Sequence, residues 1–343
     1  MTATTVIHPP GPAAARTADE APRAVPKGGD PSDRVFRGSA RGAGAVVLLI
    51  MTLVGVFLGT RALEALTDAG PSFFTTSAWE PDSHNFGIAA VLTGTVLIGG
   101  VAILIALPLA VGTALYITEY APRRLKPWLI TLVDLMAAVP SVVYGLWGFF
   151  LLQPNVVGLS RWLTTYAGWF PLFAVDGDTP SDPLSPNTYY TSSTFIAGIV
   201  VALMVTPIAC SVMREAFAQA PPGEREGAFA LGATQWGVIR SVVLPFGKGG
   251  IIGGTMLGLG RALGETIAVY MIISPVFEVQ PHILQNGANS VSALIALRYG
   301  SASQFGMSAL MAAGLSLFVM TLIVNFIASS VVARSRSGAG ADA

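Results

Sequence analysis

Charged residues are scarce in this chain: Asp, Glu, Lys and Arg make up 11% of its 343 residues, hydrophobic residues make up 52%, and nineteen basic residues balance nineteen acidic ones. Soluble domains carry about 25% charged residues, so the composition excludes an ordinary soluble domain and predicts a membrane protein. A single cysteine excludes an intrachain disulfide, and three scattered histidines give no metal-ligand spacing. We expect no metal, no cofactor and, with zero net charge, no nucleic-acid partner.

Six long apolar stretches follow an N-terminal segment of different composition. Residues 1–40 are rich in Ala, Pro and Gly without apolar periodicity, which predicts a disordered tail. Each stretch can cross a hydrocarbon core of about 30 Å, which takes roughly 20 helical residues. The sequence therefore predicts an all-α bundle over residues 41–335, in contact with membrane lipid, and a short tail at 336–343. The six spans are expected near Ala43–Thr60, Phe86–Tyr116, Trp128–Leu152, Thr194–Met213, Gly250–Ser274 and Gly306–Ala333.

The basic residues indicate how the bundle is oriented. Most of them fall in the N-terminal tail, in the second-to-third and fourth-to-fifth connections, and at the C-terminal end. Only Arg61, Arg161 and Arg298 fall in the other connections. The positive-inside rule then places both termini in the cytoplasm.

The third span carries polar groups near its middle. Within PSVVYGLWG, Pro140 removes a backbone hydrogen bond, and Ser141 and Tyr144 offer hydroxyl groups close to that kink. An ordinary kink that shapes the bundle would give the same pattern. Ser141 and Tyr144 are therefore candidates for a polar path, with a structural kink as the alternative.

The connection between the fourth and fifth spans, residues 214–249, has an unusual spacing of acid, small, glycine and Leu-Pro residues. It contains EREGAFALGATQWGVIRSVVLPFGKGG. The pattern predicts two short amphipathic helices, near residues 222–231 and 234–243, which are joined at a glycine turn and stopped by Leu-Pro. The spaced residues are Glu226, Gly227, Ala228, Gly232, Leu244 and Pro245.

This connection resembles the EAA loop of ABC importer permeases, a family of bacterial plasma-membrane proteins. The spacing matches throughout, although Gly227 stands at the second position of the motif and Val242 where isoleucine is usual. The resemblance implies a type I ABC importer permease fold. It also implies that the loop docks on a separate ATP-binding subunit, with Glu226, Ala228 and Gly232 as docking residues.

The chain carries no nucleotide-binding motif of its own. The pattern G-x-x-x-x-G-K-[ST] does not occur, and FGKGG at 246–250 lacks both the first glycine and the hydroxyl residue. We therefore expect a protein that is not an enzyme, with ATP hydrolysis supplied by partner subunits.

The fifth span contains two charges within GRALGETIAV. If a continuous helix begins near Gly249, Arg261 lies about 18 Å and Glu265 about 24 Å along it, both within the hydrocarbon core. An arginine at this depth costs about 2.5 to 3.5 kcal/mol on insertion scales. The pair therefore either serves function or forms a structural salt bridge between residues one turn apart.

The same segment resembles the signature of the phosphate-specific transport permeases. Taken together with PSVVYGLWG in the third span, it resembles the PstC-type branch of these permeases in particular. The resemblance covers about residues 86–333. It implies that the chain forms half of a path for inorganic phosphate, lined by Arg261, Glu265, Thr266, Ser141 and Tyr144. It also implies three kinds of partner: a homologous PstA-like permease, two PstB-like ATP-binding subunits and an extracytoplasmic PstS-like phosphate-binding protein.

Phosphate chemistry suits this expectation. Arg261 offers planar, bidentate donors to phosphate oxygens, and an ionised Glu265 accepts a hydrogen bond from P–OH, which sulfate lacks. In an alternative hypothesis, Arg261 and Glu265 pair with each other in the closed state, and Arg261 is released when the path opens. Two other functions stay open: a permease for another oxyanion, and a membrane scaffold or sensor of phosphate signalling.

Overall fold

The computed structural model describes residues 31–178, 182 and 184–336. The chain divides into two compact units, Met1–Val54 and Gly55–Ala343. In the first unit the described residues form the beginning of helix α1 (Pro31–Ala69), and its side chains from 43 to 54 are exposed. Residues 31–40 are helical, so the prediction that the disordered tail extends to residue 40 is wrong for these residues. The tails predicted at 1–30 and 337–343 lie outside the described residues.

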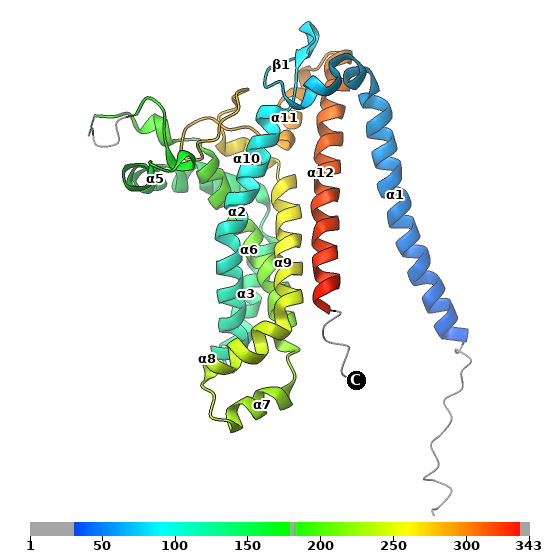
Figure 1. Cartoon of the computed structure of the whole chain (residues 1–343), viewed down its shortest axis with the longest axis vertical. Coiled ribbons are helices and arrows are strands. Elements are labelled where there is room, and N and C mark those ends of the chain that lie inside the picture. The colour runs from blue at the N-terminus through cyan, green and yellow to red at the C-terminus, as the bar shows by residue number, and fades with distance from the viewer. Residues whose placement is uncertain (1–30, 179–181, 183, 337–343) are drawn as a thin grey trace, which may run out of the picture. The chain divides into compact units, whose positions relative to one another are not determined.

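Four long helices form the body of the second unit. Helix α6 packs against both α2 and α9, and α9 packs against α12; Figure 1 shows them side by side. Their bounds are α2 Ala89–Leu115, α6 Thr194–Ala218, α9 Leu244–Gly264 and α12 Gln304–Arg336.

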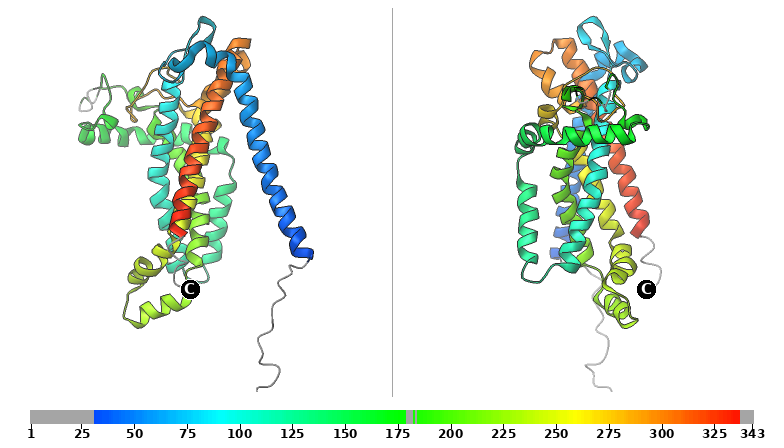
Figure 2. Two further views of the ribbon diagram at one scale, coloured as in Figure 1. Left: turned by 45° about the vertical axis from the view of Figure 1, so that its right-hand side comes forward. Right: turned by 90° about the vertical axis from the view of Figure 1, so that its left-hand side faces the viewer.

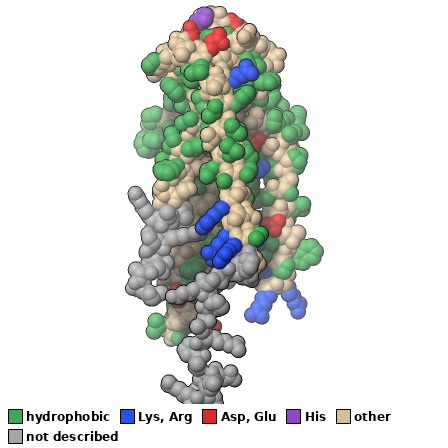
Figure 3. All heavy atoms as spheres, turned by 90° about the vertical axis from the view of Figure 1, so that its right-hand side faces the viewer, with side chains coloured by type: hydrophobic (Ala, Val, Ile, Leu, Met, Phe, Trp, Pro, Cys, Tyr) green, Lys and Arg blue, Asp and Glu red, His purple; other side chains and the backbone are tan. Residues whose placement is uncertain are grey.

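The described part of the chain has six helical segments that are long and apolar enough to cross a membrane. On the face shown in Figure 3, hydrophobic side chains extend along the helices, and charged side chains gather mostly toward the ends. The predicted all-α, six-span fold is therefore confirmed. The segments are Arg34–Phe74, Ala89–Tyr120, Ser141–Ala167, Thr194–Ala218, Gln235–Gly264 and Gln304–Ile327.

The third span is built from several pieces. Helix α3 (Lys126–Ala138) is followed by α4 (Ser141–Trp147), a π-helical turn at Gly148–Leu152, and α5 (Gln153–Ala167). Figure 2 shows α5 crossing the direction of the neighbouring helices. The pieces that run along the bundle therefore end near Leu152, whereas the segment long and apolar enough to cross a membrane is Ser141–Ala167, which begins and ends later than the predicted span Trp128–Leu152.

Shorter elements lie at the two ends of this unit (Figure 1). One end carries α7 (Pro222–Ala230) and α8 (Gln235–Val238). The other carries the antiparallel strands β1 (Trp79–Glu80) and β2 (Asn85–Phe86) and helix α11 (Val291–Arg298). Helix α10 spans Ile267–Ile272. Single helical turns also occur at Gly70–Phe74, Pro81–Ser83, Tyr116–Tyr120, Pro171–Phe173, Asn187–Tyr190, Ile239–Val243 and Tyr299–Ser301.

Glycines on one side of α9 bring it close to α6. A Cβ added at Gly258 would lie 2.5 Å from Val205 Cγ1, and one at Gly254 would lie 2.9 Å from the carbonyl oxygen of Ala209. No larger side chain fits there unless the helices separate. The opposite side of α9, at Gly260, is more open, because a Cβ there would come no closer than 3.7 Å to any atom outside its own helix.

Candidate functional site

The fifth span is interrupted next to its two charges. Helix α9 ends at Gly264, Glu265 has an extended backbone (φ −67°, ψ 127°), and α10 begins two residues later. The buried Glu265 side chain caps α10, since its Oε1 accepts a hydrogen bond of 3.1 Å from the Ala268 amide. The Ser292 hydroxyl donates to the Glu265 carbonyl at 2.7 Å. The continuous fifth helix expected from the sequence is therefore wrong, because these contacts satisfy the polar groups of a break.

The two charges point to different surroundings. Arg261 is exposed in the last turn of α9, whereas Glu265 is only 9% exposed. Within the described residues the two form no ion pair, so this structure does not contain the salt bridge considered above.

Arg261 lines a cavity of about 710 Å³. The walls come from α6, α9 and α12, and most of them are apolar or glycine. Because Arg261 forms no ion pair within the described residues, it can bind an anion in this space without first breaking one. The lining residues are Ile208, Met256, Leu257, Gly260, Arg261, Gly264, Gly314, Leu317, Phe318, Thr321 and Asn325.

The third span is also broken, at Pro140. Helix α3 ends at Ala138, Val139 and Pro140 are extended, and α4 begins at Ser141. Proline has no amide hydrogen to continue the helix. The Tyr144 hydroxyl donates a 2.9 Å hydrogen bond back across the break to the carbonyl of Met136. Tyr144 thus satisfies part of the backbone that the kink frees.

The two breaks lie next to each other, because α4 packs on α10. The contact depends on Gly145, where an added Cβ would lie 3.0 Å from the Cα of Ala268 and 3.1 Å from Met271 Sδ. Thr266 stands inside the fifth-span break and its hydroxyl donates to the Gly264 carbonyl at 3.2 Å. The structure therefore brings Tyr144, Thr266 and Arg261 into one region. Ser141, half-buried, opens α4 beside them.

We expect Gly145→Val to destabilise this junction by about 1 to 3 kcal/mol, because the added methyl groups would force α4 and α10 apart. The thermal unfolding of the purified transporter in detergent measures the effect. Gly158→Val is the matched control, since a Cβ at Gly158 in α5 meets nothing within 4 Å. Equal melting temperatures for the two variants would contradict the packing described.

The first short helix predicted in the connection 214–249 is present as α7. Gly232 has φ +85°, in the left-handed region that glycine adopts at little cost. The Gly232 amide donates to the Phe229 carbonyl at 2.9 Å, and the Ala233 amide donates to the Ala228 carbonyl at 3.0 Å. These two bonds form a Schellman motif, which ends the helix and turns the chain.

The predicted docking residues on α7 differ in their exposure. Glu226 and Gly227 are exposed and Ala228 is half-buried. The sequence patterns did not single out two apolar side chains beside them, Phe229 (46% exposed) and Leu231 (91% exposed). Phe229 and Leu231 therefore add exposed apolar area beside Glu226.

Leu244 and Pro245 do not stop the second helix, contrary to expectation. The chain is helical from Gln235 through Gly264, with a π-helical turn at Ile239–Val243. In that turn the Leu244 amide donates to the Ile239 carbonyl, five residues earlier. The wider turn relieves the clash that a proline ring makes with the preceding turn, so the helix continues.

Arg225 is a site residue that the sequence reasoning missed. Its Nη1 lies 3.1 Å from Glu119 Oε1, and its Nη2 donates to the Phe217 carbonyl at 2.7 Å. The Gln235 amide group donates to the Glu119 carbonyl at 3.3 Å. These contacts tie α7 to the ends of the second and fourth spans. The sequence could not indicate that Arg225 forms an ion pair, because its partner Glu119 lies 106 positions earlier in the chain.

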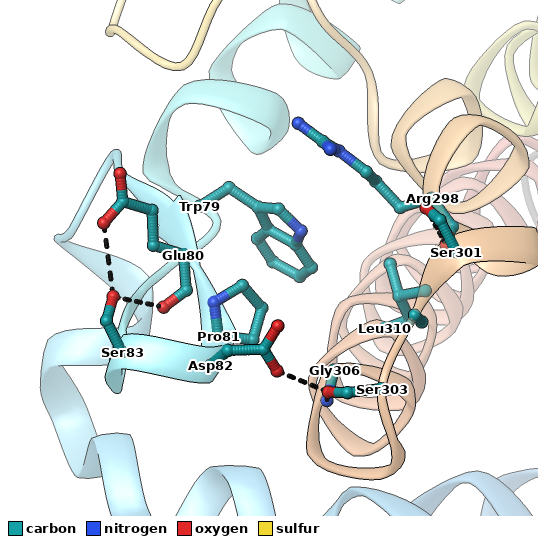
Figure 4. A pocket seen from close by; sticks show the side chains of 11 residues that line it. Trp79, Glu80, Pro81, Asp82, Ser83, Arg298, Ser301, Ser303, Gly306 and Leu310 are labelled. Carbon is teal, nitrogen blue, oxygen red and sulfur yellow. Dashed lines mark hydrogen bonds between the residues drawn. The ribbon is translucent and has the colours of Figure 1, made fainter.

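A second cavity, of about 450 Å³, lies at the other end of the unit. Figure 4 shows Glu80 and Asp82 on one wall and Arg298 on another, with Trp79 between them. The Ser303 hydroxyl donates to Asp82 and holds α12 to the strand connection. Charges of both signs can therefore contact a partner at this end.

The connection after α5 contains hydrogen bonds between its own side chains. Asp178 accepts hydrogen bonds from the hydroxyl groups of Ser185 and Tyr190. Burial, together with the hydrogen bond to Asp178, raises the pKa of Tyr190 to about 12. Arg161 joins this connection to α5 by donating to the Ser185 carbonyl at 2.7 Å.

Comparison with known proteins identifies relatives over most of this length. Residues 106–337 match the family described as binding-protein-dependent transport system inner membrane component. "Phosphate transport system permease protein PstC 2" of Mycobacterium tuberculosis is 36% identical over 313 residues, 89% of this chain and 93% of that protein. "Phosphate transport system permease protein PstC" of Mycobacterium leprae is 38% identical over 306 residues, 87% of this chain and 92% of that protein.

A solved structure shares the fold at low identity. It is a chain of the bacterial alginate ABC transporter in complex with an alginate pentasaccharide-bound periplasmic protein. The TM-score is 0.56 at 16% identity, over 88% of this chain and 96% of that chain. The likeness shows that the helices are arranged as in an ABC importer permease.

Proposed function

The chain belongs to the binding-protein-dependent transport system inner membrane component family, and we propose that it is the permease subunit of an ATP-driven importer of inorganic phosphate. The observation that carries the proposal is Arg261, which opens into a cavity between membrane helices in a chain whose relatives are named phosphate transport permeases. In this function the chain provides half of the path, and a homologous PstA-like permease provides the other half.

Arg261 is the group that we assign to phosphate. A guanidinium presents parallel N–H donors that match two oxygens of a phosphate ion, and it stays charged at every physiological pH. An arginine within the membrane is costly, and such residues mark ion paths. Its exposure to the 710 Å³ cavity supports a role in anion transit rather than in helix pairing.

The other proposed path residues shape the place where the anion passes. Tyr144 and Ser141 come from the kink in the third span, and Thr266 comes from the break in the fifth. We assign a positioning role to Glu265, because one of its carboxylate oxygens holds the first turn of α10. Breaks of this kind near mid-membrane supply polar atoms for substrate and allow helix segments to move.

The docking loop is proposed to receive the work of ATP hydrolysis. Glu226, Gly227, Ala228 and Gly232 form the surface that meets a PstB-like ATP-binding subunit, while Leu244 and Pro245 join it to the fifth span. Phe229 and Leu231 add exposed apolar contact area. Two ATP-binding subunits serve the two permeases, and this chain has no nucleotide chemistry of its own.

The remaining assignments concern orientation and the extracytoplasmic side. We place both termini in the cytoplasm of a bacterial plasma membrane, with a cytoplasmic tail at 1–40, the permease domain at 41–335 and a short tail at 336–343. The cavity at β1 and α11 then faces outward. Its mixed charges suit a contact with a PstS-like phosphate-binding protein.

Uptake of radiolabelled phosphate by a deletion strain tests the proposal. Restoring the gene should restore uptake, and excess sulfate or molybdate should not compete. Competition by those anions would support a permease for another oxyanion. Unchanged uptake in the deletion strain, with altered phosphate-responsive gene expression, would support a scaffold or sensor instead.

Glu265→Gln separates the positioning role from a role in reading the phosphate proton. The glutamine carbonyl can still accept from the Ala268 amide, so we expect uptake and sulfate exclusion to stay near normal. Glu265→Leu should cost about 1 kcal/mol of stability because the cap on α10 is lost. Uptake with sulfate as competitor, together with thermal unfolding, measures both effects. Sulfate entry through Glu265→Gln would show that the carboxylate reads the P–OH group.

A further inference from the structure

Two polar side chains of α12 face the cavity that Arg261 lines. Thr321 and Asn325 lie one helical turn apart, on the same face of α12, and both line the 710 Å³ space. They stand on the wall opposite α9. With Arg261 they are the polar members of a lining that is otherwise apolar or glycine.

Asn325 is unusual in its position. It interrupts the run LFVMTLIVNFI within the sixth span, where an amide group without a partner is costly. Within the described part of the chain, no hydrogen bond engages the side chain of Asn325. The Thr321 hydroxyl, in contrast, donates to the Phe318 carbonyl at 2.9 Å, so its oxygen can still accept a hydrogen bond. The amide of Asn325 is therefore available to a ligand.

Gly260 keeps the space between Asn325 and α9 open. A Cβ at Gly260 would lie 3.7 Å from Asn325 Oδ1, its nearest neighbour outside the helix. A glycine at this position lets the asparagine reach the helix surface directly beside Arg261, the next residue. One anion can thus meet both groups.

We propose that Asn325, supported by Thr321, forms the second wall of the phosphate site and hydrogen-bonds the ion that Arg261 holds. The inference rests on the proposed function and adds a specificity-determining residue to it. The Asn325 Nδ2 group donates to a phosphate oxygen, and Oδ1 accepts from P–OH. Phosphate at neutral pH carries such a proton and sulfate does not, so Oδ1 favours phosphate. One carboxylate oxygen of Glu265, Oε1, caps α10, and Asn325 offers a further acceptor on the α12 wall.

Cysteine labelling tests whether Asn325 faces an anion site. Cys210 is the chain's single cysteine, so Cys210→Ala gives a background without thiols in this subunit. The complete transporter carrying Asn325→Cys is placed in lipid nanodiscs and treated with one of two thiol reagents. Sulfonatoethyl methanethiosulfonate is anionic, and trimethylammonioethyl methanethiosulfonate is cationic. The same measurement on Ser330→Cys, a partly exposed position further along α12, is the control.

We expect the anionic reagent to modify Asn325→Cys faster than the cationic one, and inorganic phosphate to protect it better than sulfate. Adding Arg261→Gln should remove the charge preference. Ser330→Cys should show neither effect. Equal rates for the two reagents, or equal protection by the two anions, would overturn the assignment. Because labelling does not require uptake, this result can fail even where the transporter imports phosphate.

Transport gives the second readout. Asn325→Ala should lower the maximal rate of phosphate uptake about ten-fold, because a hydrogen bond to a charged ligand is lost. Asn325→Asp should lower it further, because the added carboxylate repels the anion. The KM should stay near normal, since the extracytoplasmic binding protein sets it, and Ser330→Ala should transport normally. Normal uptake by both Asn325 variants would contradict the proposal, whereas absent uptake by the unaltered transporter would contradict the proposed function itself.

Discussion

Arg261→Lys should lower the rate of phosphate transport by about 10- to 100-fold while leaving the amount of assembled transporter unchanged. Lysine keeps the positive charge but replaces two parallel donors with one point charge, so the bidentate hold on phosphate is lost. Arg261 is exposed to the cavity and forms no ion pair with Glu265, so the change leaves no buried partner behind. Uptake of radiolabelled phosphate, normalised to the amount of transporter, measures the effect.

Two further variants sharpen this expectation. Arg261→Gln removes the charge as well and should abolish transport. Arg61→Lys, an exposed arginine of α1 whose ring contact to Phe57 tolerates either cation, should transport normally. Near-normal uptake by Arg261→Lys would show that Arg261 acts through charge alone and that bidentate recognition plays no part.

The second large effect is expected at Arg225, which ties α7 to the membrane helices. Arg225→Met leaves Glu119, 4% exposed, without its cation, and should destabilise the transporter by about 3 kcal/mol. It also removes the bond to the Phe217 carbonyl. We therefore expect ATP hydrolysis to continue without import, because movement of the docking helix no longer reaches the second and fourth spans.

The double variant Arg225→Met/Glu119→Leu separates stability from coupling. Removing the unpaired carboxylate should restore most of the melting temperature, because an apolar pair can replace a buried ion pair at little cost. Import per ATP hydrolysed should stay low. Arg123→Met, in an exposed connection next to Glu119, is the control and should behave normally. A double variant that imports phosphate at the unaltered rate would show that Arg225 contributes stability only.

Features that depend on local patterns were predictable from the sequence. The six spans follow from apolar length, and α7 with its turn at Gly232 follows from helix periodicity and a glycine at the C-terminal position. The kink at Pro140 follows from the missing amide hydrogen. Each of these needs only neighbours in the chain to decide its conformation.

Features that depend on distant partners were not predictable. The break at Glu265 is stabilised by Ser292, far along the chain, as well as by the local cap on Ala268. Arg225 depends on Glu119 in the same way. Helical spacing alone predicts that Arg261 and Glu265 lie one turn apart on the same face. Because the helix breaks between them and α10, Arg261 lines a cavity whereas the Glu265 side chain is buried in the protein.

Leu244 and Pro245 illustrate a local rule with two outcomes. A Leu-Pro pair usually marks the end of a helix, because proline cannot donate to the preceding turn. Here a π-helical turn before Pro245 accommodates the ring, and the helix continues into the membrane. The connection 214–249 and the fifth span are therefore joined by continuous helix.

ATP-dependent phosphate uptake by proteoliposomes tests the central claim most directly. The vesicles hold this chain, its partner permease and the two ATP-binding subunits, with the phosphate-binding protein added outside. We predict that radiolabelled phosphate accumulates only when ATP and this chain are both present, that excess sulfate does not reduce it, and that Arg261→Gln abolishes it. Accumulation that is unchanged by Arg261→Gln, or that sulfate suppresses, would contradict the assignment of this chain as the phosphate path.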